Sequence, residues 1–432
     1  MKKRSVAEER NVMKKGNPAK MLAAVLAAAM LMGACGQSQA TGTTAAGAAA
    51  ETTAAPAQTA AAPAQTAAPA STPAPETTAA PATTAAPETT QAQATPATRF
   101  VTGSDGVTVE IPYQVDRVAP VIGALAQMTE ILSEGRGVIV AAATNNISDY
   151  FREVFPDYNE SNPNNYSASS VEDLIAANTQ VVFGVSTLFS DEQKQQLKDA
   201  GVSFVATDNV ATVDGLCETY TIIGDILGGN APARAKEFVE YYRNAIDDSK
   251  ARTAGVTERK KVLELFYSAD SFTTVNSTDI SNTYVEAAGG VNVAADYTVT
   301  KPSDGSSGGR GGASQLTVDA EQIVAWNPDL IVVGSQAGRD VILSDPAIQT
   351  VTAVKNGDVY VCPYGIYLWN VRSGEGAMVS PWLGKLLYPE LFEDVDPVGI
   401  VKDYFKRFYN TEITDEKAEQ ILAGDASNAM TR

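Results

Sequence analysis

Apolar and polar residues alternate along residues 99–432 in two distinct patterns. Short β-branched runs, such as residues 180–186 (QVVFGVS) and 329–334 (DLIVVG), predict strands that are buried on both faces. Between these runs, apolar residues recur at helical spacing. Strands that alternate with helices indicate βαβ units, so we predict an α/β fold with mainly parallel central sheets.

One predicted helix, over residues 230–254, is longer than the others. It follows a Gly-Gly-Asn turn, and Pro232 is suited to its first turn. At 1.5 Å per residue it would be roughly 33 Å long, enough to run along a two-lobed molecule. We therefore predict an N-terminal α/β lobe at 99–229, an interlobe helix at 230–254 and a C-terminal α/β lobe at 255–432.

An internal repeat supports two lobes of similar build. Residues 172–186 and 321–335 each begin with Glu, continue with a short helical pattern and an Asn, and end in an apolar strand followed by Ser. The alternative is that any helix–loop–strand unit would share these features. We favour two equivalent lobes, because the strand pattern on its own already divides the chain in the same way.

The first 98 residues have a different composition. Basic residues followed by an apolar run at 21–34 predict a lipoprotein signal peptide over residues 1–35, with Cys35 as the lipidated residue. The alternatives are an ordinary secretory signal with an incidental Cys, and a translation start at Met13 rather than Met1. Residues 36–98 are rich in Ala, Thr and Pro and lack large apolar side chains, so they predict a disordered tether.

Composition excludes several classes of function. The 432 residues include 32 Lys+Arg and 51 Asp+Glu, for a net charge of −19, which argues against nucleic-acid binding. No histidine is present, so a Ser-His-Asp triad and a His-ligated zinc site are impossible. We predict that the protein is not an enzyme and needs no cofactor. Cys217 and Cys362 are expected to be small buried residues.

Several motifs in the second half resemble the iron-complex and cobalamin class of ABC-transporter substrate-binding proteins. They lie at residues 286–294 (EAAGGVNVA), 316–333, 369–375 (WNVRSGE) and 381–392 (PWLGKLLYPELF). The resemblance implies two α/β lobes joined by one long helix, with a ligand cleft between the lobes. It also implies a monomer that delivers its ligand to a permease dimer with its ATPase.

Polar and aromatic residues that follow the predicted strands are candidates for the ligand site, because ligands of open parallel sheets bind beyond the carboxyl ends of the strands. The candidates are Asn145, Asn146, Ser186, Arg310, Tyr364, Tyr367, Trp369 and Arg372. Arg310 lies in a glycine-rich segment that is suited to binding an anion. For Trp369 the alternative is packing in the core, and for Arg310 it is a solvated surface loop.

The candidate side chains indicate the class of ligand. Flat aromatic rings beside arginines suit an anionic ligand with planar faces, and the lack of imidazole disfavours bare Zn²⁺ or Mn²⁺. We therefore predict a chelated metal complex, an iron–siderophore or related iron complex above all. Haem, cobalamin and an oxyanion such as molybdate remain alternatives. A chelatase-type enzyme on a related fold and a wall-associated adhesin are more remote ones.

The resemblance also implies contacts with the permease. In this class an acidic residue on each lobe docks with basic pockets of the permease, and the matching residues are Glu172 and Glu321. The alternative is that both glutamates interact with the dipole of the helix that they begin. The protein is predicted to lie outside the cytoplasm, anchored by lipid to the outer face of the cytoplasmic membrane.

Overall fold

A computed structural model describes residues 97–143, 147–207, 210–268, 270–298 and 316–424, all of which lie in the unit Thr89–Arg432. The predicted signal peptide and Cys35 lie outside these ranges, as does the tether up to residue 96. Within the described ranges, none of the helices combines the length and the apolar character needed to cross a membrane.

The first lobe is built on a three-stranded parallel sheet in the order β3-β4-β5. All four residues of the central strand β4 are buried, as its unbroken apolar sequence VVFG predicts. A separate antiparallel hairpin, β1 and β2, precedes the sheet. The strands are β1 (Thr98–Thr102), β2 (Thr108–Pro112), β3 (Val118–Pro120), β4 (Val181–Gly184) and β5 (Ser203–Ala206).

Among the described residues, six helices belong to the first lobe, and side chains cap several of them. Ser170 caps α4 and Ser190 caps α5 through a complete capping box, so the polar residues before these helices fix where they begin. The helices are α1 (Gly123–Ser133), α2 (Asp149–Val154), α3 (Pro156–Ser161), α4 (Val171–Ala176), α5 (Asp191–Asp199) and α6 (Val213–Leu227).

The second lobe has a six-stranded sheet in the order β11-β10-β6-β7-β9, with β8 paired to β6. Strand β10 runs parallel to both β6 and β11, whereas β7 runs antiparallel to β6 and β9. The predicted parallel core is therefore confirmed, with antiparallel strands added at one edge. The strands are β6 (Lys261–Ser268), β7 (Ser271–Thr274), β8 (Val291–Asn292), β9 (Leu316–Val318), β10 (Leu330–Val333) and β11 (Val359–Val361).

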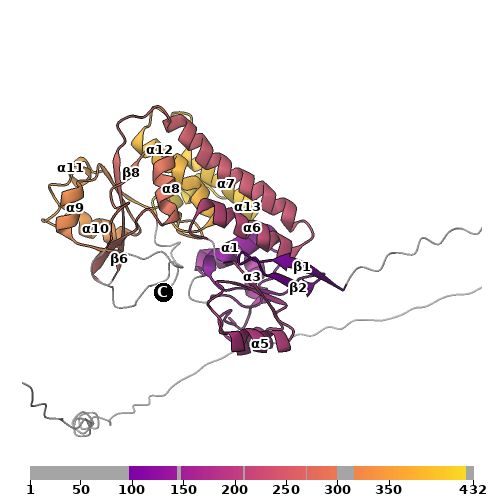
Figure 1. The fold of residues 1–432 in the computed structure, drawn as a ribbon. Coiled ribbons are helices and arrows are strands. Elements are labelled where there is room, and N and C mark those ends of the chain that lie inside the picture. Colours follow the sequence, from indigo (N-terminus) through magenta and orange to yellow (C-terminus); the bar gives the residue numbers. More distant parts are fainter. Residues whose placement is uncertain (1–96, 144–146, 208–209, 269, 299–315, 425–432) are drawn as a thin grey trace, which may run out of the picture. The chain divides into compact units, whose positions relative to one another are not determined.

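Helices cover both faces of this second sheet. Figure 1 shows α9, α10 and α11 on one side and α8 and α12 on the other. These helices are α8 (Ile280–Ala287), α9 (Ala320–Trp326), α10 (Gln336–Ser344), α11 (Thr352–Asn356) and α12 (Val379–Leu387). The 3-10 helix η2 (Gly374–Met378) precedes α12, and the described part of the chain ends with α13 (Pro397–Tyr409) and α14 (Asp415–Leu422).

The long helix α7 (Ala231–Thr253) connects the two lobes, as predicted for residues 230–254. Its buried face carries Ala235, Phe238, Tyr242 and Ile246 at helical spacing, and Pro232 lies in its first turn. The Phe238 ring stacks on Tyr220 of α6, with ring centroids 4.0 Å apart. Helix α7 runs beside α6 and α13 (Figure 1).

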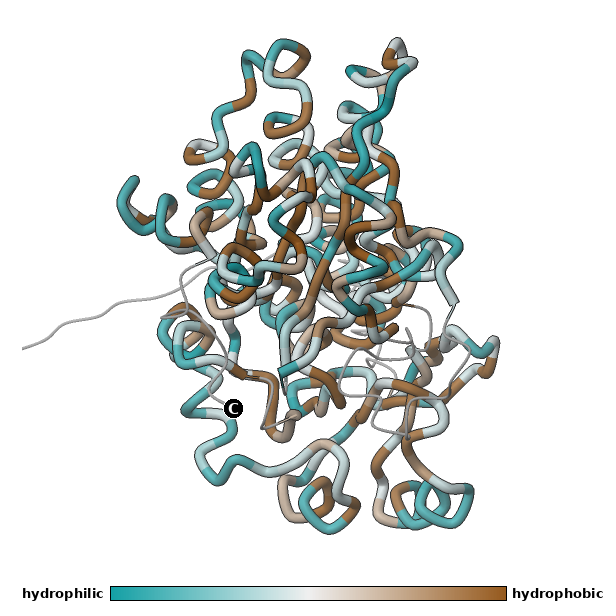
Figure 2. Tube along the Cα trace, turned by 90° about the vertical axis from the view of Figure 1, so that its left-hand side faces the viewer, coloured by the Kyte–Doolittle hydropathy of each residue, from teal (hydrophilic) through white to brown (hydrophobic). Residues whose placement is uncertain are grey.

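Two hydrophobic cores hold the fold together. The larger core joins the first lobe, α7, α8 and the last helices α12 to α14, and the smaller one lies around the second sheet. Figure 2 shows hydrophobic residues gathered in the central strands and hydrophilic residues on the outer helical turns. Cys217 and Cys362 are both buried, as expected of small apolar residues. The last helices therefore extend the core of the first lobe, although they follow the second lobe in sequence.

Candidate functional site

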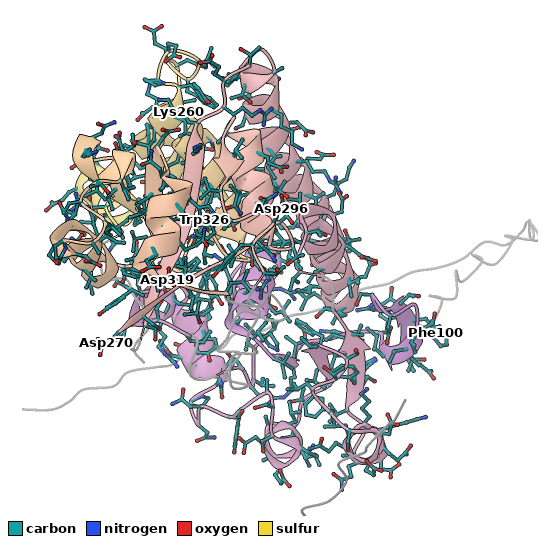
Figure 3. The ribbon with its side chains drawn as sticks, turned by 60° about the vertical axis from the view of Figure 1, so that its left-hand side comes forward. Phe100, Lys260, Asp270, Asp296, Asp319 and Trp326 are labelled. Carbon is teal, nitrogen blue, oxygen red and sulfur yellow. The ribbon has the colours of Figure 1, made fainter. Side chains whose placement is uncertain are left out.

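The carboxyl ends of the parallel strands place part of the predicted ligand site. Ser186 follows β4 by two residues and is half-buried. In the second lobe, β10 and β11 are in register, and the segment that contains four predicted ligand residues follows β11. Asp270 lies at the β6–β7 turn (Figure 3). The Tyr267 hydroxyl donates to its carboxylate at 3.1 Å. Asn145, Asn146 and Arg310 lie outside the described residues.

Residues 363–373, which we call the 363–373 loop, form a compact turn between β11 and η2. The Gly365 N–H donates to the Tyr367 carbonyl at 3.2 Å, and the Trp369 N–H donates to the Pro363 carbonyl at 3.2 Å. The Tyr364 N–H bonds the Ile421 carbonyl of α14 at 3.0 Å. These bonds fold the backbone of the segment that carries Tyr364, Tyr367, Trp369 and Arg372 into one compact turn.

The aromatic residues of the loop are less open than the sequence suggests. Trp369 is 1% exposed and Tyr364 is 9% exposed, so neither presents an open ring face. Trp369 belongs to the large hydrophobic core, which is the alternative role weighed for it above. Tyr367 is half-buried and is the aromatic residue of this segment with the most accessible surface.

Arg372 is buried beside a carboxylate. Its Nη2 lies 3.8 Å from Oδ2 of Asp279, the residue that caps α8, and both side chains are under 10% exposed. Burial lowers the pKa of Arg372, whereas the charge of Asp279 acts in the opposite direction. Nε of Arg372 and Nε1 of Trp369 have no hydrogen-bond partner within the described residues. Two buried donors on the same loop are thus left without acceptors.

A buried carboxylate holds the 363–373 loop through hydrogen bonds, and it was not among the candidate residues predicted from the sequence. Glu375 of η2 is fully buried. Its Oε2 accepts from the Gly365 N–H at 3.1 Å, and its Oε1 accepts from the Ile366 N–H at 3.0 Å and the Tyr409 hydroxyl at 2.7 Å. Burial raises the pKa of Glu375 to about 7, although these hydrogen bonds oppose the shift. The available signal was its place in the 369–375 motif, between two glycines.

The two predicted docking residues are on the surface, one in each lobe. Glu172 lies in the first turn of α4 and Glu321 in the first turn of α9, and both are exposed. The Ser170 hydroxyl donates to the Glu172 carboxylate at 3.3 Å. Their positions suit a contact with another protein and equally suit the dipole of the helix. The choice between the two roles stays a prediction.

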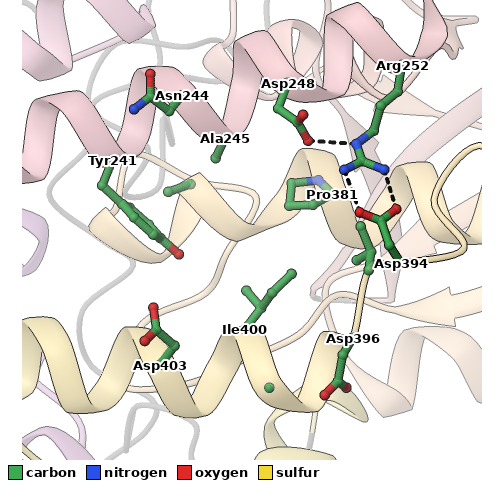
Figure 4. Close-up of a pocket in the computed structure, with 13 residues that line it drawn as sticks. Tyr241, Asn244, Ala245, Asp248, Arg252, Pro381, Asp394, Asp396, Ile400 and Asp403 are labelled. Atoms are coloured by element: carbon green, nitrogen blue, oxygen red, sulfur yellow. Dashed lines mark hydrogen bonds and ion pairs between the residues drawn. The ribbon is translucent and has the colours of Figure 1, made fainter.

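One hollow in the described part of the chain lies away from the strand ends. A groove of about 540 Å³ runs between α7 and the start of α13, with Ala245, Pro381 and Ile400 among its apolar lining. At one end Arg252 binds Asp394 at 2.5 and 2.9 Å and Asp248 at 2.7 Å (Figure 4). These ion pairs satisfy the guanidinium, so this hollow offers less to an anion than the buried donors of the 363–373 loop.

No cluster of three or more Cys, Asp or Glu side chains in the described ranges is arranged to hold a metal ion. The sequence has no histidine to complete such a site. The described candidate residues carry donor groups: the guanidinium of Arg372, the indole N–H of Trp369 and the hydroxyls of the half-buried Tyr367 and Ser186. Such a set binds anions better than it binds bare cations.

Comparison with known proteins identifies related sequences. Residues 159–364 match the model of a family described as periplasmic binding protein. The molybdate-binding protein MolA of Haemophilus influenzae is 24% identical over 335 residues, which cover 72% of this chain and 86% of that protein. A cobalamin-binding protein of Halobacterium salinarum is 24% identical over 199 residues, covering 45% of this chain and 48% of that protein.

Solved structures share the fold. A periplasmic solute binding protein from Veillonella parvula superimposes with a TM-score of 0.65 at 21% identity, covering 77% of this chain and 98% of that one. MolA with molybdate bound gives a TM-score of 0.57 at 21% identity and covers 73% and 99%. CeuE of Helicobacter pylori with Ni(II) bound gives 0.56 at 21% identity and covers 75% and 99%. The predicted two-lobed fold with one long connecting helix is confirmed.

Proposed function

We propose that the protein captures a small anionic solute outside the cytoplasm and delivers it to an ABC importer, because residues 159–364 match the periplasmic binding protein family. The named relatives are binding proteins, which supports a role in binding rather than in catalysis. We further propose that the solute is an oxyanion of the molybdate type.

The observation that carries this ligand is the pair of buried donors without acceptors, Nε of Arg372 and Nε1 of Trp369. A buried donor that lacks a partner costs free energy, and an anion that accepts from both would recover it. The 3.8 Å ion pair with Asp279 is loose and leaves part of the guanidinium available. The likeness to a molybdate-binding protein over most of both chains supports the same ligand class.

An iron complex, the ligand predicted from the sequence, is the second candidate. It rests on Tyr367, the accessible ring beside the positive charge of Arg372. A flat chelate needs open aromatic faces, and Tyr364 and Trp369 do not provide them in this conformation. The names of the relatives mention molybdate, cobalamin and nickel, and none of them singles out an iron–siderophore. We therefore place the oxyanion first.

Calorimetric titration with molybdate, ferric siderophores, haem, cobalamin and free Zn²⁺ would test the ligand class. We expect molybdate to bind, and Arg372→Ala to weaken it by about 1.5–3 kcal/mol, the range for a charge-assisted hydrogen bond. Arg243→Ala is the matched control, because Arg243 is an exposed residue of α7 paired with Asp214. Binding of chelates without molybdate would move the ligand to the second candidate, and binding of free Zn²⁺ alone would contradict both.

The docking role of Glu172 and Glu321 is also a proposal. Charge reversal to Arg at either residue should reduce uptake in cells and leave ligand affinity unchanged, since like charges would then face basic pockets of the permease. Glu192→Arg is the control, because Glu192 is likewise exposed in the first turn of a helix, α5. Equal loss of uptake in the control would assign the effect to helix stability instead.

Anchoring through Cys35 completes the proposal. Lipid on Cys35 would hold the protein at the outer face of the membrane, with residues 36–98 as the tether. Membrane fractionation of wild type and Cys35→Ala tests this. We expect the variant to be released or to remain uncleaved. A correctly cleaved variant that stays with the membrane would contradict lipid anchoring.

A further inference from the structure

A closed ring of hydrogen bonds supports the 363–373 loop. Gln127 donates through Nε2 to the Tyr409 hydroxyl at 2.7 Å, and that hydroxyl donates to Oε1 of Glu375 at 2.7 Å. The Gly374 N–H, next to Glu375 in sequence, donates back to Oε1 of Gln127 at 2.8 Å. Gln127 and Glu375 are fully buried and Tyr409 is 4% exposed, so water does not compete for these bonds.

The ring joins parts of both lobes to the loop. Gln127 belongs to α1 of the first lobe, Glu375 to η2 after the second sheet, and Tyr409 to the end of α13. Ser148, which caps α2 in the first lobe, adds a weaker contact from its hydroxyl to the Ile366 carbonyl at 3.4 Å. The loop that carries Arg372 and Trp369 is therefore fastened to the first lobe as well as to its own.

The ring is built for an ionised Glu375. Two backbone N–H groups and one hydroxyl donate to its two oxygens. The Tyr409 hydroxyl already accepts from Gln127, so its own proton is directed at Glu375. A protonated Glu375 would bring an additional proton into a set of donors and would weaken at least one of these bonds.

The electrostatic surroundings place this ionisation near neutral pH. Among the described residues, the pKa values of four phenols respond to the Glu375 charge: Tyr150 of α2, Tyr220 of α6, and Tyr404 and Tyr409 of α13. Phenols carry no charge at neutral pH, and burial raises the pKa of each of these four. Burial therefore raises the pKa of Glu375, the hydrogen-bond donors lower it, and the two effects together give a value of about 7.

We propose that Glu375 is a positioning residue that holds the 363–373 loop in its ligand-binding shape and fastens it to helix α1 through Tyr409 and Gln127. The importance of this for ligand affinity rests on the proposed function. Space beneath the loop is tight, because a Cβ at Gly365 would collide with Oε2 of Glu375. The carboxylate therefore fits one loop conformation closely.

Hydrogen exchange of the loop amides and titration with molybdate, on the intact chain, test the proposal. In Glu375→Gln we expect the Gly365 and Ile366 amides to exchange about tenfold faster, because a carboxamide is a weaker acceptor than a carboxylate. Molybdate should bind about tenfold more weakly, from the same loss. After correction for intrinsic exchange, wild-type protection should rise from pH 6 to pH 8, and the variant should show no such rise.

Tyr409→Phe is the milder variant, should Glu375→Gln fail to fold. It removes one donor to Glu375 and the link to Gln127, and leaves the two amide bonds in place. Tyr220→Phe is the matched control, because its buried hydroxyl has no partner within the described residues. Loop exchange and affinity unchanged from the control in both Tyr409→Phe and Glu375→Gln would overturn the proposal.

The two readouts separate this inference from the ligand assignment. If wild type does not bind molybdate, the proposed ligand fails, while faster exchange of the loop amides in the variants still establishes the positioning role. If wild type binds molybdate and the variants bind it equally well with unaltered exchange, the ligand assignment stands and the positioning role fails.

Discussion

Two glutamates, Glu130 in α1 and Glu375 in η2, are equally buried but differ in what surrounds their carboxyl groups. Glu375 accepts three hydrogen bonds, whereas the two oxygens of Glu130 accept none from the described residues. Burial, with the charge of Asp157 added, raises the pKa of Glu130 to about 8, and that of Glu375 is raised to about 7. The three hydrogen bonds to Glu375 therefore offset only part of the free-energy cost of burying its ionised carboxylate.

Because their pKa values differ, Glu130 and Glu375 differ in protonation state at neutral pH. Glu130 stays mostly protonated and behaves as a neutral side chain in the core. Glu375 is close to half ionised, and its donors favour the charged form. A buried carboxyl without donors affects stability, whereas one surrounded by donors can also fix the shape of a loop.

The largest expected effect is on the pH dependence of stability, through Glu130. Its folded-state pKa lies above the unfolded value, so its contribution is fully present below about pH 4.5 and is lost as pH rises through about 8. The loss is on the order of 5 kcal/mol. Glu130→Gln should remove this decline, which urea unfolding at pH 5, 7 and 9 would measure. Parallel pH profiles of wild type and variant would contradict the raised pKa of Glu130.

A smaller effect on stability is expected from removing one of the hydrogen-bond donors to Glu375. Tyr409→Phe removes a hydrogen bond to a buried carboxylate and should lower the free energy of unfolding at pH 8 by about 1–3 kcal/mol. Tyr220→Phe removes a buried hydroxyl that has no partner in the described part of the chain, so its cost should be close to zero. Denaturant unfolding of both variants measures the contrast, and equal losses would show that the Tyr409 bond contributes no stability.

The smallest expected effect is that of Glu130 on ligand binding. Within the described residues, no hydrogen bond joins the Glu130 carboxyl group to the 363–373 loop or to its supporting ring, so Glu130→Gln should change molybdate affinity by less than about twofold. Glu375→Gln, by contrast, should weaken it. Calorimetry of both variants at pH 7 makes the comparison. Equal weakening would mean that the two buried glutamates affect the site only through general stability.

Much of the fold could be predicted because hydrophobic periodicity is a local property. Helix α7 (Ala231–Thr253) and strand β10 (Leu330–Val333) lie within one or two residues of the predicted ranges. The antiparallel strands β7 and β9 were not predicted, since their short, partly polar sequences resemble loops. The likeness to binding proteins came from motifs spread over the second lobe, which periodicity alone would not have identified.

The site was less predictable, because burial of a polar residue depends on distant partners. Trp369 was placed correctly on the loop after β11, but its 1% exposure results from packing in the large core, which adjacent residues do not reveal. Glu375, flanked by glycines, has the local pattern of a surface turn. Its burial follows from Gln127 and Tyr409, which no local pattern connects to it.

The ring of hydrogen bonds that supports the 363–373 loop also affects when this loop forms during folding. Gln127 and Tyr409 are 282 residues apart, and Gln127 and Gly374 are 247 apart. Contacts of such high sequence separation form late, because much of the chain must already be arranged before they can close. A chain in which Tyr409 is not yet in place contains the strands, Arg372 and Trp369. It lacks the hydrogen bonds of Tyr409 to Gln127 and Glu375, which hold the 363–373 loop in position. We therefore expect the 363–373 loop to take its fixed shape only after α13 has docked against α1.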